Sequence, residues 1–441
     1  MRQRGLRVNP SPRGDTLKWF FFGAFWREAS VRGILRGREE AAVKRLGLAA
    51  VGLVVWLGAC HLVLPERFAV NVPIGSLLGG AKAPPEDVIR SRIRVPEGFR
   101  IGVFAEDVSG ARGLRFTPRG DLLVSVPNSD RIELLEADLD GDGRSDGRRV
   151  VIDDLHRPYG MDFHDGWLYI GETDAVGRIR FDAANGATRG EYERLVTGIP
   201  DGGHWTRTLR FGSDGWLYLS IGSSCNVCDE EDPRRAAIVR YRADGSGEEI
   251  YATGLRNAVG FDWHPHTGEL YANDNGRDLL GDDFPPCELN RVEAGGFYGW
   301  PVANGDRIPD PDLGEGEEDR IQGSIAPVHS YPAHNAPLGL AFIRGGHVPP
   351  DYRGAALSAL HGSWNRSEKD GYKVVSLHWQ PDGSIEQRDF VSGFEVDDDV
   401  IGRPVDVAEG PEGAFYISDD YAGLIYRVAG DDAARAAAGS R

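Results

Sequence analysis

Cysteine is scarce in this chain of 441 residues, which contains only Cys60, Cys225, Cys228 and Cys287. The pair in "SSCNVCDE" has C-x-x-C spacing, but Asp229 follows it where attachment of a c-type haem requires histidine, so that haem is excluded. A zinc site would need two further ligands nearby. In an oxidising compartment the simplest prediction is a local disulfide between Cys225 and Cys228, with Cys287 either free or a competing partner.

Long apolar runs are also lacking, with one exception, "LGLAAVGLVVWLGACHLVL" at residues 46–64. About nineteen uncharged residues are enough to cross a bilayer as a helix. Because Lys and Arg crowd residues 1–45, the positive-inside rule predicts a basic cytoplasmic segment 1–45, a transmembrane anchor 46–64 and a body in the periplasm or outside. A cleaved signal peptide is the alternative, since "LGAC" loosely resembles a lipoprotein cleavage box. Either way, the body is exported.

The body is poor in basic charge. The whole chain has a net charge of -18, and residues 1–45 contribute about +7, which leaves about -25 for the remainder. Such an acidic body argues against a nucleic-acid partner. Residues 65–90, rich in Pro, Gly and Ala, are expected to form a linker, and residues 431–441 a disordered tail.

A repeated pattern dominates residues 91–430. Each copy has an apolar strand, a turn containing Gly, a second apolar strand, a variable loop and a third strand. The copies begin at residues 113, 160, 208, 260, 339 and 404, and their third strands are "DRIELL", "GRIRF", "AIVRY", "LNRV", "YKVVSL" and "GLIYRV". The pattern predicts an all-β fold, a six-bladed β-propeller of four-stranded blades, preceded by the single transmembrane helix. The stretch 93–107 is expected to close the ring, and the acidic stretch 304–320 to form an excursion. A β-sandwich with accidental similarity is the alternative.

Polar residues occur just before the first strand of each copy. Because first strands line the channel of a propeller, these residues are expected to surround one channel mouth. They are Arg112, Arg157 with Tyr159, His204 with Arg207, Arg256 with Asn257, His334 with Asn335, and Arg403. Converging guanidinium groups predict an anionic ligand, although a salt bridge to a nearby Asp explains any single Arg. His204 is the natural general base of this ring.

Two loops are candidate metal sites. The stretch "DLDGDGRSD" has the spacing of a calcium loop. Its predicted ligands are Asp138, Asp140, Asp142, the backbone carbonyl of Arg144, and Asp146. Arg149 stands at position twelve where Glu is usual, and a solvated acidic turn is the alternative. The second loop, "DNGRDLLGDD" at residues 274–283, could hold a hard cation or form an ordinary turn.

The motifs "GGHWTRTLRF", "GLRNAVGFDW", "NGRDLLGDDFPPCELNRV", "GGFYGWP", "HGSWNR" and "GRPVDV" resemble the glucose/sorbosone dehydrogenase family of six-bladed propellers. The resemblance covers about residues 93–428 and is closer to the sorbosone and pyranose dehydrogenase branch. It implies pyrroloquinoline quinone, a tricarboxylated quinone that lies over the channel mouth and is held by Arg residues and a calcium ion. It also implies oxidation of an aldose or related sugar at the anomeric carbon.

The resemblance also implies roles for individual residues. His204 would take the proton from the anomeric hydroxyl, and Arg256 and Asn257 would contact the quinone oxygens. Backbone carbonyls of Gly276 and Arg277 would hold the cofactor calcium. The remaining candidates for cofactor binding are Arg157, Arg207, Trp364, Arg366 and Arg403.

Two residues depart from the family pattern. Ser223 stands where soluble glucose dehydrogenases have an Asp that partners the base, and Val405 where they have a second Arg. The expected partners are a sugar substrate and a respiratory acceptor, either a quinone or a cytochrome. The alternatives are a calcium-dependent lactonase-type hydrolase and a propeller that binds a glycan or protein without catalysis.

Overall fold

The computed structural model describes residues 69–73, 75 and 80–430. The predicted anchor 46–64, the basic segment 1–45, Cys60 and the tail 431–441 lie outside the described residues. Among the described residues, no helix combines the length and apolar composition that a bilayer span requires.

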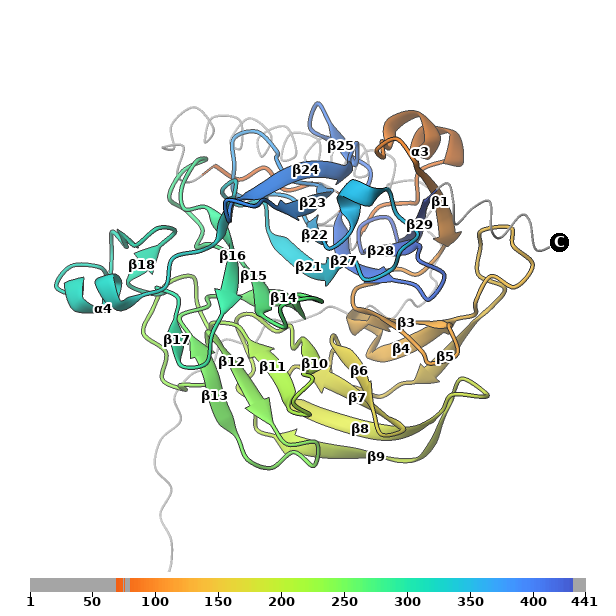
Figure 1. The fold of residues 1–441 in the computed structure, drawn as a ribbon, viewed down its shortest axis with the longest axis horizontal. Helices are drawn as coiled ribbons and strands as arrows, with labels where there is room; N and C mark the ends of the chain where they lie inside the picture. The colour runs from red at the N-terminus through yellow and green to blue at the C-terminus, as the bar shows by residue number, and fades with distance from the viewer. Residues whose placement is uncertain (1–68, 74, 76–79, 431–441) are drawn as a thin grey trace, which may run out of the picture. The chain divides into compact units, whose positions relative to one another are not determined.

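Six mainly antiparallel sheets follow one another around a common centre, as the view in Figure 1 shows. The first three comprise β2 (Leu114–Phe116), β3 (Leu122–Val126), β4 (Arg131–Leu135) and β5 (Arg148–Ile152); β6 (Met161–His164), β7 (Trp167–Glu172), β8 (Ala175–Asp182) and β9 (Ala187–Thr197); and β10 (Leu209–Phe211), β11 (Leu217–Ile221), β12 (Ala237–Tyr241) and β13 (Glu249–Thr253). The predicted six-bladed propeller of four-stranded blades is confirmed.

The last three blades carry the longer insertions. They comprise β14 (Ala258–Trp263), β15 (Leu270–Asp274), β16 (Cys287–Val292) and β20 (His329–Tyr331); β21 (Pro337–Phe342), β22 (Ala356–Leu360), β23 (Lys373–Trp379) and β24 (Ile385–Val391); and β27 (Pro404–Glu409), β28 (Phe415–Asp419) and β29 (Leu424–Gly430) with β1 (Phe99–Ala105). The fifth blade departs from the repeat because its second strand begins only at Ala356, after the 3-10 turn η3 (Pro350–Tyr352).

Strand β1 closes the ring. It pairs antiparallel with β29, with Phe99 opposite Gly430 and Val103 opposite Tyr426. The expectation that the stretch 93–107 completes the last blade is therefore confirmed. The helix α3 (Glu86–Arg92), which begins within the predicted linker, leads into this strand (Figure 1).

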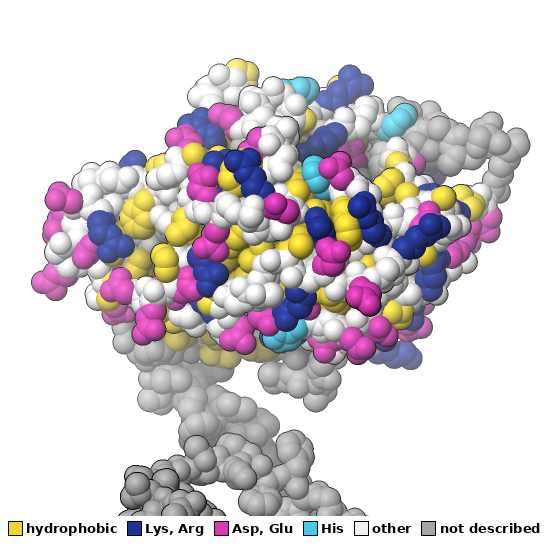
Figure 2. Space-filling model, turned by 90° about the horizontal axis from the view of Figure 1, so that it is seen from below, with side chains coloured by type: hydrophobic (Ala, Val, Ile, Leu, Met, Phe, Trp, Pro, Cys, Tyr) yellow, Lys and Arg dark blue, Asp and Glu magenta, His cyan; other side chains and the backbone are white. Residues whose placement is uncertain are grey.

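Each blade is apolar in the middle and polar at its outer edge. Every residue of β3, β11 and β22 is buried, whereas most residues of the outer strands β5, β9 and β13 are half-buried or exposed. Ion pairs such as Arg240 with Glu249, 2.9 Å apart, cover these outer edges. Figure 2 shows basic and acidic side chains interspersed on the side of the propeller.

The acidic excursion extends from the fourth blade. Between β16 and β20 the chain forms β17 (Gly296–Phe297), β18 (Ala303–Asn304), β19 (Ile308–Pro309) and α4 (Glu318–Gly323). β17 adds to the third blade by pairing parallel with β13. The other short elements are the 3-10 turn η2 (Pro127–Ser129) and the hairpin of β25 (Glu395–Val396) and β26 (Asp399–Val400).

The channel is plugged by apolar side chains beneath the mouth where the polar ring was predicted. Tyr159, Val259, Leu338 and Val405 form one buried cluster, and Trp205 packs against it. Val405 is completely buried. Since burying an unpaired charge there would be unfavourable, the position favours an apolar residue over the second Arg of the family pattern.

Candidate functional site

The predicted ring lies above this apolar plug. Two kinds of segment meet here: the residues that precede each first strand and the loops that join the second strand of each blade to its third. We call this region the cup and define it by His204, Trp205, Asn257, His361 and Arg403. These residues come from four different segments, so only the closed propeller brings them together.

His204 is held by Ser223. Its Nδ1 lies 3.0 Å from both the carbonyl oxygen and the Oγ of Ser223. Because the Ser223 hydroxyl donates to the carbonyl of Cys225 at 2.7 Å, it accepts from the imidazole, and the proton is therefore on Nδ1. Ser223 thus supplies the orienting contact for which the family pattern has Asp, and Nε2 keeps its lone pair.

The environment of His204 keeps the imidazole neutral. Burial, followed by the neighbouring charge of Arg256, lowers its pKa to about 3. Arg235 and Arg207 act in the same direction. A histidine in this state can accept a proton at neutral pH without first losing one.

Arg256 is fully engaged by the protein. Its Nε donates to the carbonyl of Asn226 at 2.9 Å, and Nη1 donates to the carbonyls of Asn275 and Gly276 at 3.2 and 3.0 Å. Nη2 donates to Oδ1 of Asn226 and to Asp278, at 2.9 and 3.0 Å. The guanidinium therefore fastens two loops together, and all five of its N–H groups are used.

Asn257 follows Arg256 in the chain, but its own side chain is free. Its backbone N–H donates to Asp274 at 2.6 Å, while its amide group has no hydrogen-bond partner within residues 80–430. A Cβ at Gly222 would lie 2.6 Å from Oδ1 of Asn257 and 2.7 Å from Cβ of His204. Only glycine lets these two side chains approach each other across this backbone.

Replacing Gly222 by Ala is therefore expected to displace His204 and Asn257 and to lower the kcat of a reaction that uses both side chains by ten- to about a hundredfold. The fold should persist, which circular dichroism and thermal unfolding would verify. Gly102→Ala is the matched control because a Cβ there meets nothing within 4 Å. Unchanged kcat in Gly222→Ala would show that the spacing of these two side chains does not matter.

A second cluster occupies the opposite side of the cup. Asp420 accepts from Arg112, and its Oδ1 lies 2.9 Å from Nε2 of His361. Arg403 donates to the carbonyls of His361 and Gly362 at 3.0 and 3.2 Å. Burial opposes ionisation of Asp420, but His361 and Arg112 hold its pKa well below its usual range. Burial and Arg403 lower the pKa of His361 to about 4, so this imidazole is neutral as well.

Trp205 joins the two clusters. The guanidinium carbons of Arg157 and Arg112 lie 4.1 and 5.4 Å from the centroid of its ring. Burial and the charge of Arg112 both lower the pKa of Arg157, as expected for two cations that converge. Within the described part of the chain, only Arg112 of this pair has a carboxylate partner. The Arg157 guanidinium therefore lies above the ring of Trp205 without a counterion.

Two other predicted residues, Arg207 and Arg366, have mainly structural contacts, and a third, Trp364, is exposed. Arg207 is completely buried and donates to the carbonyls of His204, Thr206 and Pro200, so it supports the cup from inside and is not available to a ligand. Arg366 donates to backbone carbonyls of Asp282 and Ala333. Trp364 is 39% exposed.

The loop proposed for the cofactor calcium has other partners. The Gly276 carbonyl accepts from Arg256, and the Arg277 side chain forms a buried ion pair with Asp310, 2.7 Å away. This pair attaches the acidic excursion to the loop. His334, a ring position, lies 2.7 Å from the Gly281 carbonyl and steadies the same loop.

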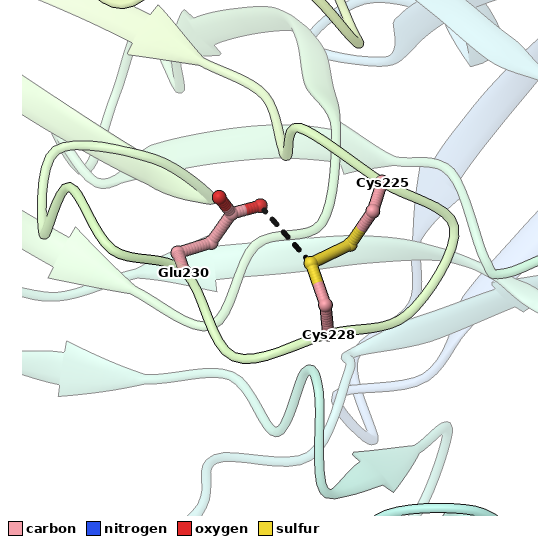
Figure 3. A group of neighbouring side chains, drawn as sticks. All are labelled: Cys225, Cys228 and Glu230. Atoms are coloured by element: carbon pink, nitrogen blue, oxygen red, sulfur yellow. Dashed lines mark hydrogen bonds between the residues drawn. A yellow bond between two sulfur atoms is a disulfide. The ribbon is translucent and has the colours of Figure 1, made fainter. Parts of the chain in front are cut away.

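The C-x-x-C loop adjoins the cup. Cys225 and Cys228 form the predicted disulfide, and Cys287 is free and buried. Figure 3 shows Glu230 beside the disulfide, with Oε1 4.0 Å from Sγ of Cys228. The Cys225 carbonyl accepts from Ser223, and the Asn226 carbonyl accepts from Arg256. The disulfide therefore closes a loop that supports both the partner of His204 and the guanidinium beside Asn257.

The acidic loop between β4 and β5 lies apart from the cup. Carboxylate oxygens of Asp138, Asp140 and Asp146 lie within 4.8 Å of one another. Asp142 is not in this group and accepts from the Arg144 backbone N–H at 2.7 Å. Three of the four predicted carboxylates are therefore gathered.

Sequence reasoning did not assign functional roles to Trp205, Asn226, Asp278, His361 and Asp420. Asn226, Asp278, His361 and Asp420 lie in loops that join a second strand to a third, and Trp205 directly follows His204. The recurrence of these loops in the repeat was the available signal.

The chain matches the family described as Glucose / Sorbosone dehydrogenase over residues 168–427. The pyrroloquinoline quinone-dependent pyranose dehydrogenase of Coprinopsis cinerea is 25% identical over 356 residues, covering 68% of this chain and 47% of that protein. The chain thus spans about half the length of this relative. An uncharacterized protein of Borreliella burgdorferi is 29% identical over 359 residues, covering 77% of this chain and 91% of that protein.

Solved structures share the propeller. The holo pyranose dehydrogenase PQQ domain from Coprinopsis cinerea has a TM-score of 0.65 at 22% identity and covers 77% of this chain and 97% of that one. The PQQ-bound aldose sugar dehydrogenase of Streptomyces coelicolor has a TM-score of 0.55 at 20% identity, with 76% and 99% covered. These likenesses support the fold, and the sequence match includes His204, Arg256, His361 and Arg403. The chain belongs to the glucose/sorbosone dehydrogenase family.

Proposed function

We propose that this protein is a pyrroloquinoline quinone-dependent dehydrogenase that oxidises a pyranose or related aldose at its anomeric carbon. The observation that carries the proposal is the neutral His204, whose Nδ1–H is fixed by Ser223 and whose Nε2 is left to accept a proton. Similarity to the pyranose and aldose sugar dehydrogenases supports the substrate class.

The residues of the cup fit a planar anion. Tyr159, Val259, Leu338 and Val405 provide an apolar floor, and Trp205 offers an aromatic edge or face beside it. Arg157 and Arg112 converge on that ring, and buried Nε of Arg112 has no hydrogen-bond partner within residues 80–430. A carboxylate here would relieve the repulsion between the two cations. Arg403, at the opposite side, is the other candidate for a carboxylate.

When bound, pyrroloquinoline quinone would supply the acceptor for the two electrons removed from the sugar. Nε2 of His204 would take the proton of the anomeric hydroxyl as the carbon is oxidised. The free amide of Asn257 would donate to a quinone oxygen, while Arg256 holds the backbone on which Asn257 lies. Arg256 thus acts through position, because its donors are already used.

A cofactor calcium on Gly276 and Arg277 fits less well. The Gly276 carbonyl already has the Arg256 guanidinium 3.0 Å away, and a divalent cation on the same oxygen would face that charge.

The proposal can be tested with the full chain in detergent. Titration with pyrroloquinoline quinone, followed by tryptophan fluorescence, should saturate in the micromolar range. Dye reduction should then be measured over a panel of pyranoses and other aldoses. Saturable binding with turnover of at least one sugar is the expected result. Absence of binding at micromolar cofactor would favour a propeller that binds a glycan or protein without catalysis.

We also propose a structural calcium ion at Asp138, Asp140 and Asp146, with Asp142 and the Arg144 carbonyl as further ligands. The loop adjoins the closing strand, since the Ser145 N–H donates to the Phe104 carbonyl at 2.9 Å. Millimolar calcium should raise Tm by a few degrees relative to EDTA, because a ligand that binds only the folded state stabilises it. The double variant Asp138→Asn, Asp140→Asn should lose this difference, whereas Asp165→Asn should keep it. Equal Tm values in calcium and EDTA would exclude the site.

For the location we propose a membrane anchor at residues 46–64, with the propeller in the periplasm or outside and electrons passed to a respiratory quinone or cytochrome. The Cys225–Cys228 disulfide supports an oxidising compartment. Protease accessibility of the propeller in intact spheroplasts would test the orientation.

A further inference from the structure

A cavity lies at the end of the channel opposite His204. Its volume is about 450 Å³, within the range of small-molecule sites. Inner strands from all six blades contribute to its lining. Its aromatic wall consists of Phe116, Phe163, Phe211, Trp263 and Phe342. The apolar plug of Tyr159, Val259, Leu338 and Val405 separates this cavity from the cup.

Arginine and aspartate alternate around this end of the channel, and most of them are paired. Arg115 pairs with Asp162, and both terminal nitrogens of Arg344 lie 2.8 Å from Asp262. Asp162 and Asp262 also accept backbone N–H groups from the following blades, of Phe211 at 2.8 Å and of Phe342 at 2.9 Å. These carboxylates are therefore committed to holding neighbouring blades together.

Arg210 is the exception. It lines the cavity, yet no hydrogen bond or ion pair joins its guanidinium to another residue within 80–430, and its Nε is buried without a partner. The remaining carboxylate of the ring, Asp406, instead accepts the N–H groups of Leu114 and Val407, both at 2.9 Å. Leaving the buried Nε–H of this guanidinium without an acceptor is unfavourable, and the two terminal nitrogens offer four further donors to a ligand.

We propose that this cavity binds a small aromatic monocarboxylate, with Arg210 as its anchor. The planar fork of Arg matches a carboxylate, and the aromatic wall suits a ring attached to it. Glu409 also lines the cavity, and its carboxylate is held by the N–H groups of Arg344 and Gly345, both at 2.7 Å. This negative charge disfavours a second carboxylate on the ligand.

Benzoate is a direct probe of the site, and the experiment needs neither quinone nor sugar, so its outcome is independent of the proposed function. Isothermal titration of the full chain in detergent should show saturable benzoate binding. Benzamide, the neutral analogue, should bind at least about tenfold more weakly, because hydrogen bonds to a charged group are the stronger ones.

Arg210→Met should also weaken benzoate binding at least about tenfold, because the cation that anchors the carboxylate is removed. Arg210→Lys keeps the charge but loses the fork, so an intermediate affinity is expected, and it serves if the Met variant fails to fold. Arg353→Met, at an exposed arginine outside the lining, should bind as the wild type does. Equal affinity for benzoate and benzamide, or for wild type and both Arg210 variants, would overturn the proposal. Chloride binding with the same affinity as benzoate in this titration would also overturn the proposal.

Discussion

Replacing His204 by Ala is expected to lower kcat for sugar oxidation about a thousandfold, the range in which a general base contributes. The reason is that Nε2 is the free basic nitrogen of a ring whose other nitrogen is bound to Ser223. Stopped-flow dye reduction with saturating cofactor measures this directly. Affinity for the quinone should change little, because the proposal assigns its carboxylates to the arginines.

Two further variants sharpen this test. Ser223→Ala removes the hydroxyl but leaves the Ser223 carbonyl, so we expect a smaller loss of about tenfold and a shifted pH dependence of kcat/KM. His266→Ala, at an exposed histidine between β14 and β15, should be indistinguishable from wild type. If His204→Ala keeps more than about a tenth of the wild-type kcat, another group must accept the proton.

Arg256→Met is expected to destabilise the protein by about 3 kcal/mol, as removal of one partner from a buried ion pair does. The Arg256 side chain is 5% exposed and that of Asp278 is 23% exposed. The change removes the Arg256 donor from that carboxylate and from the carbonyls of Asn275 and Gly276. The Asn226 oxygens lose one donor each but still accept from the Asp278 N–H and from Nε1 of Trp300. Urea unfolding followed by tryptophan fluorescence measures the effect, which should appear as a lower midpoint.

A surface arginine provides the control for this variant. Arg291→Met removes exposed pairs with Glu269 and Glu293, and such pairs contribute at most about 1 kcal/mol. A loss in Arg256→Met no larger than that in Arg291→Met would mean that the two loops hold together without the Arg256 guanidinium. Quinone binding should then be measured for Arg256→Met without urea, where the variant is still folded. A weaker affinity than that of the wild type would show that Arg256 also positions Asn257.

Inner strands could be predicted from the sequence because they carry the repeat. The third strand of blade three was predicted at 237–241, and β12 spans Ala237–Tyr241. Outer strands such as β5 and β9 were not located, because they are half exposed and lack a regular apolar pattern. In the fifth blade the first strand and the third strand "YKVVSL" were predicted, but the second strand, β22, was not located because it follows a long insertion.

The ring of cations could be predicted because its positions recur, but the partner of each cation could not. Arg256 was placed correctly just before a first strand, yet its acceptors lie 19 to 30 residues further along or back in two loops. Arg207 lies just before the first strand of blade three, as Arg256 does in blade four, but its side chain is completely buried. Which way such a side chain points depends on the carbonyls that unrelated loops present, and no local spacing encodes that.

The pairing of β1 with β29 has a consequence for how the molecule is made. The last blade contains the first strand of the propeller and the final three, so it cannot form until nearly the whole chain has emerged from the ribosome or translocon. Until then β1 is an unsatisfied edge that invites aggregation, and five blades stand as an open arc. A truncation before Leu424 would therefore cost far more stability than the loss of one strand, because without β29 the strand β1 has no partner and the ring cannot close.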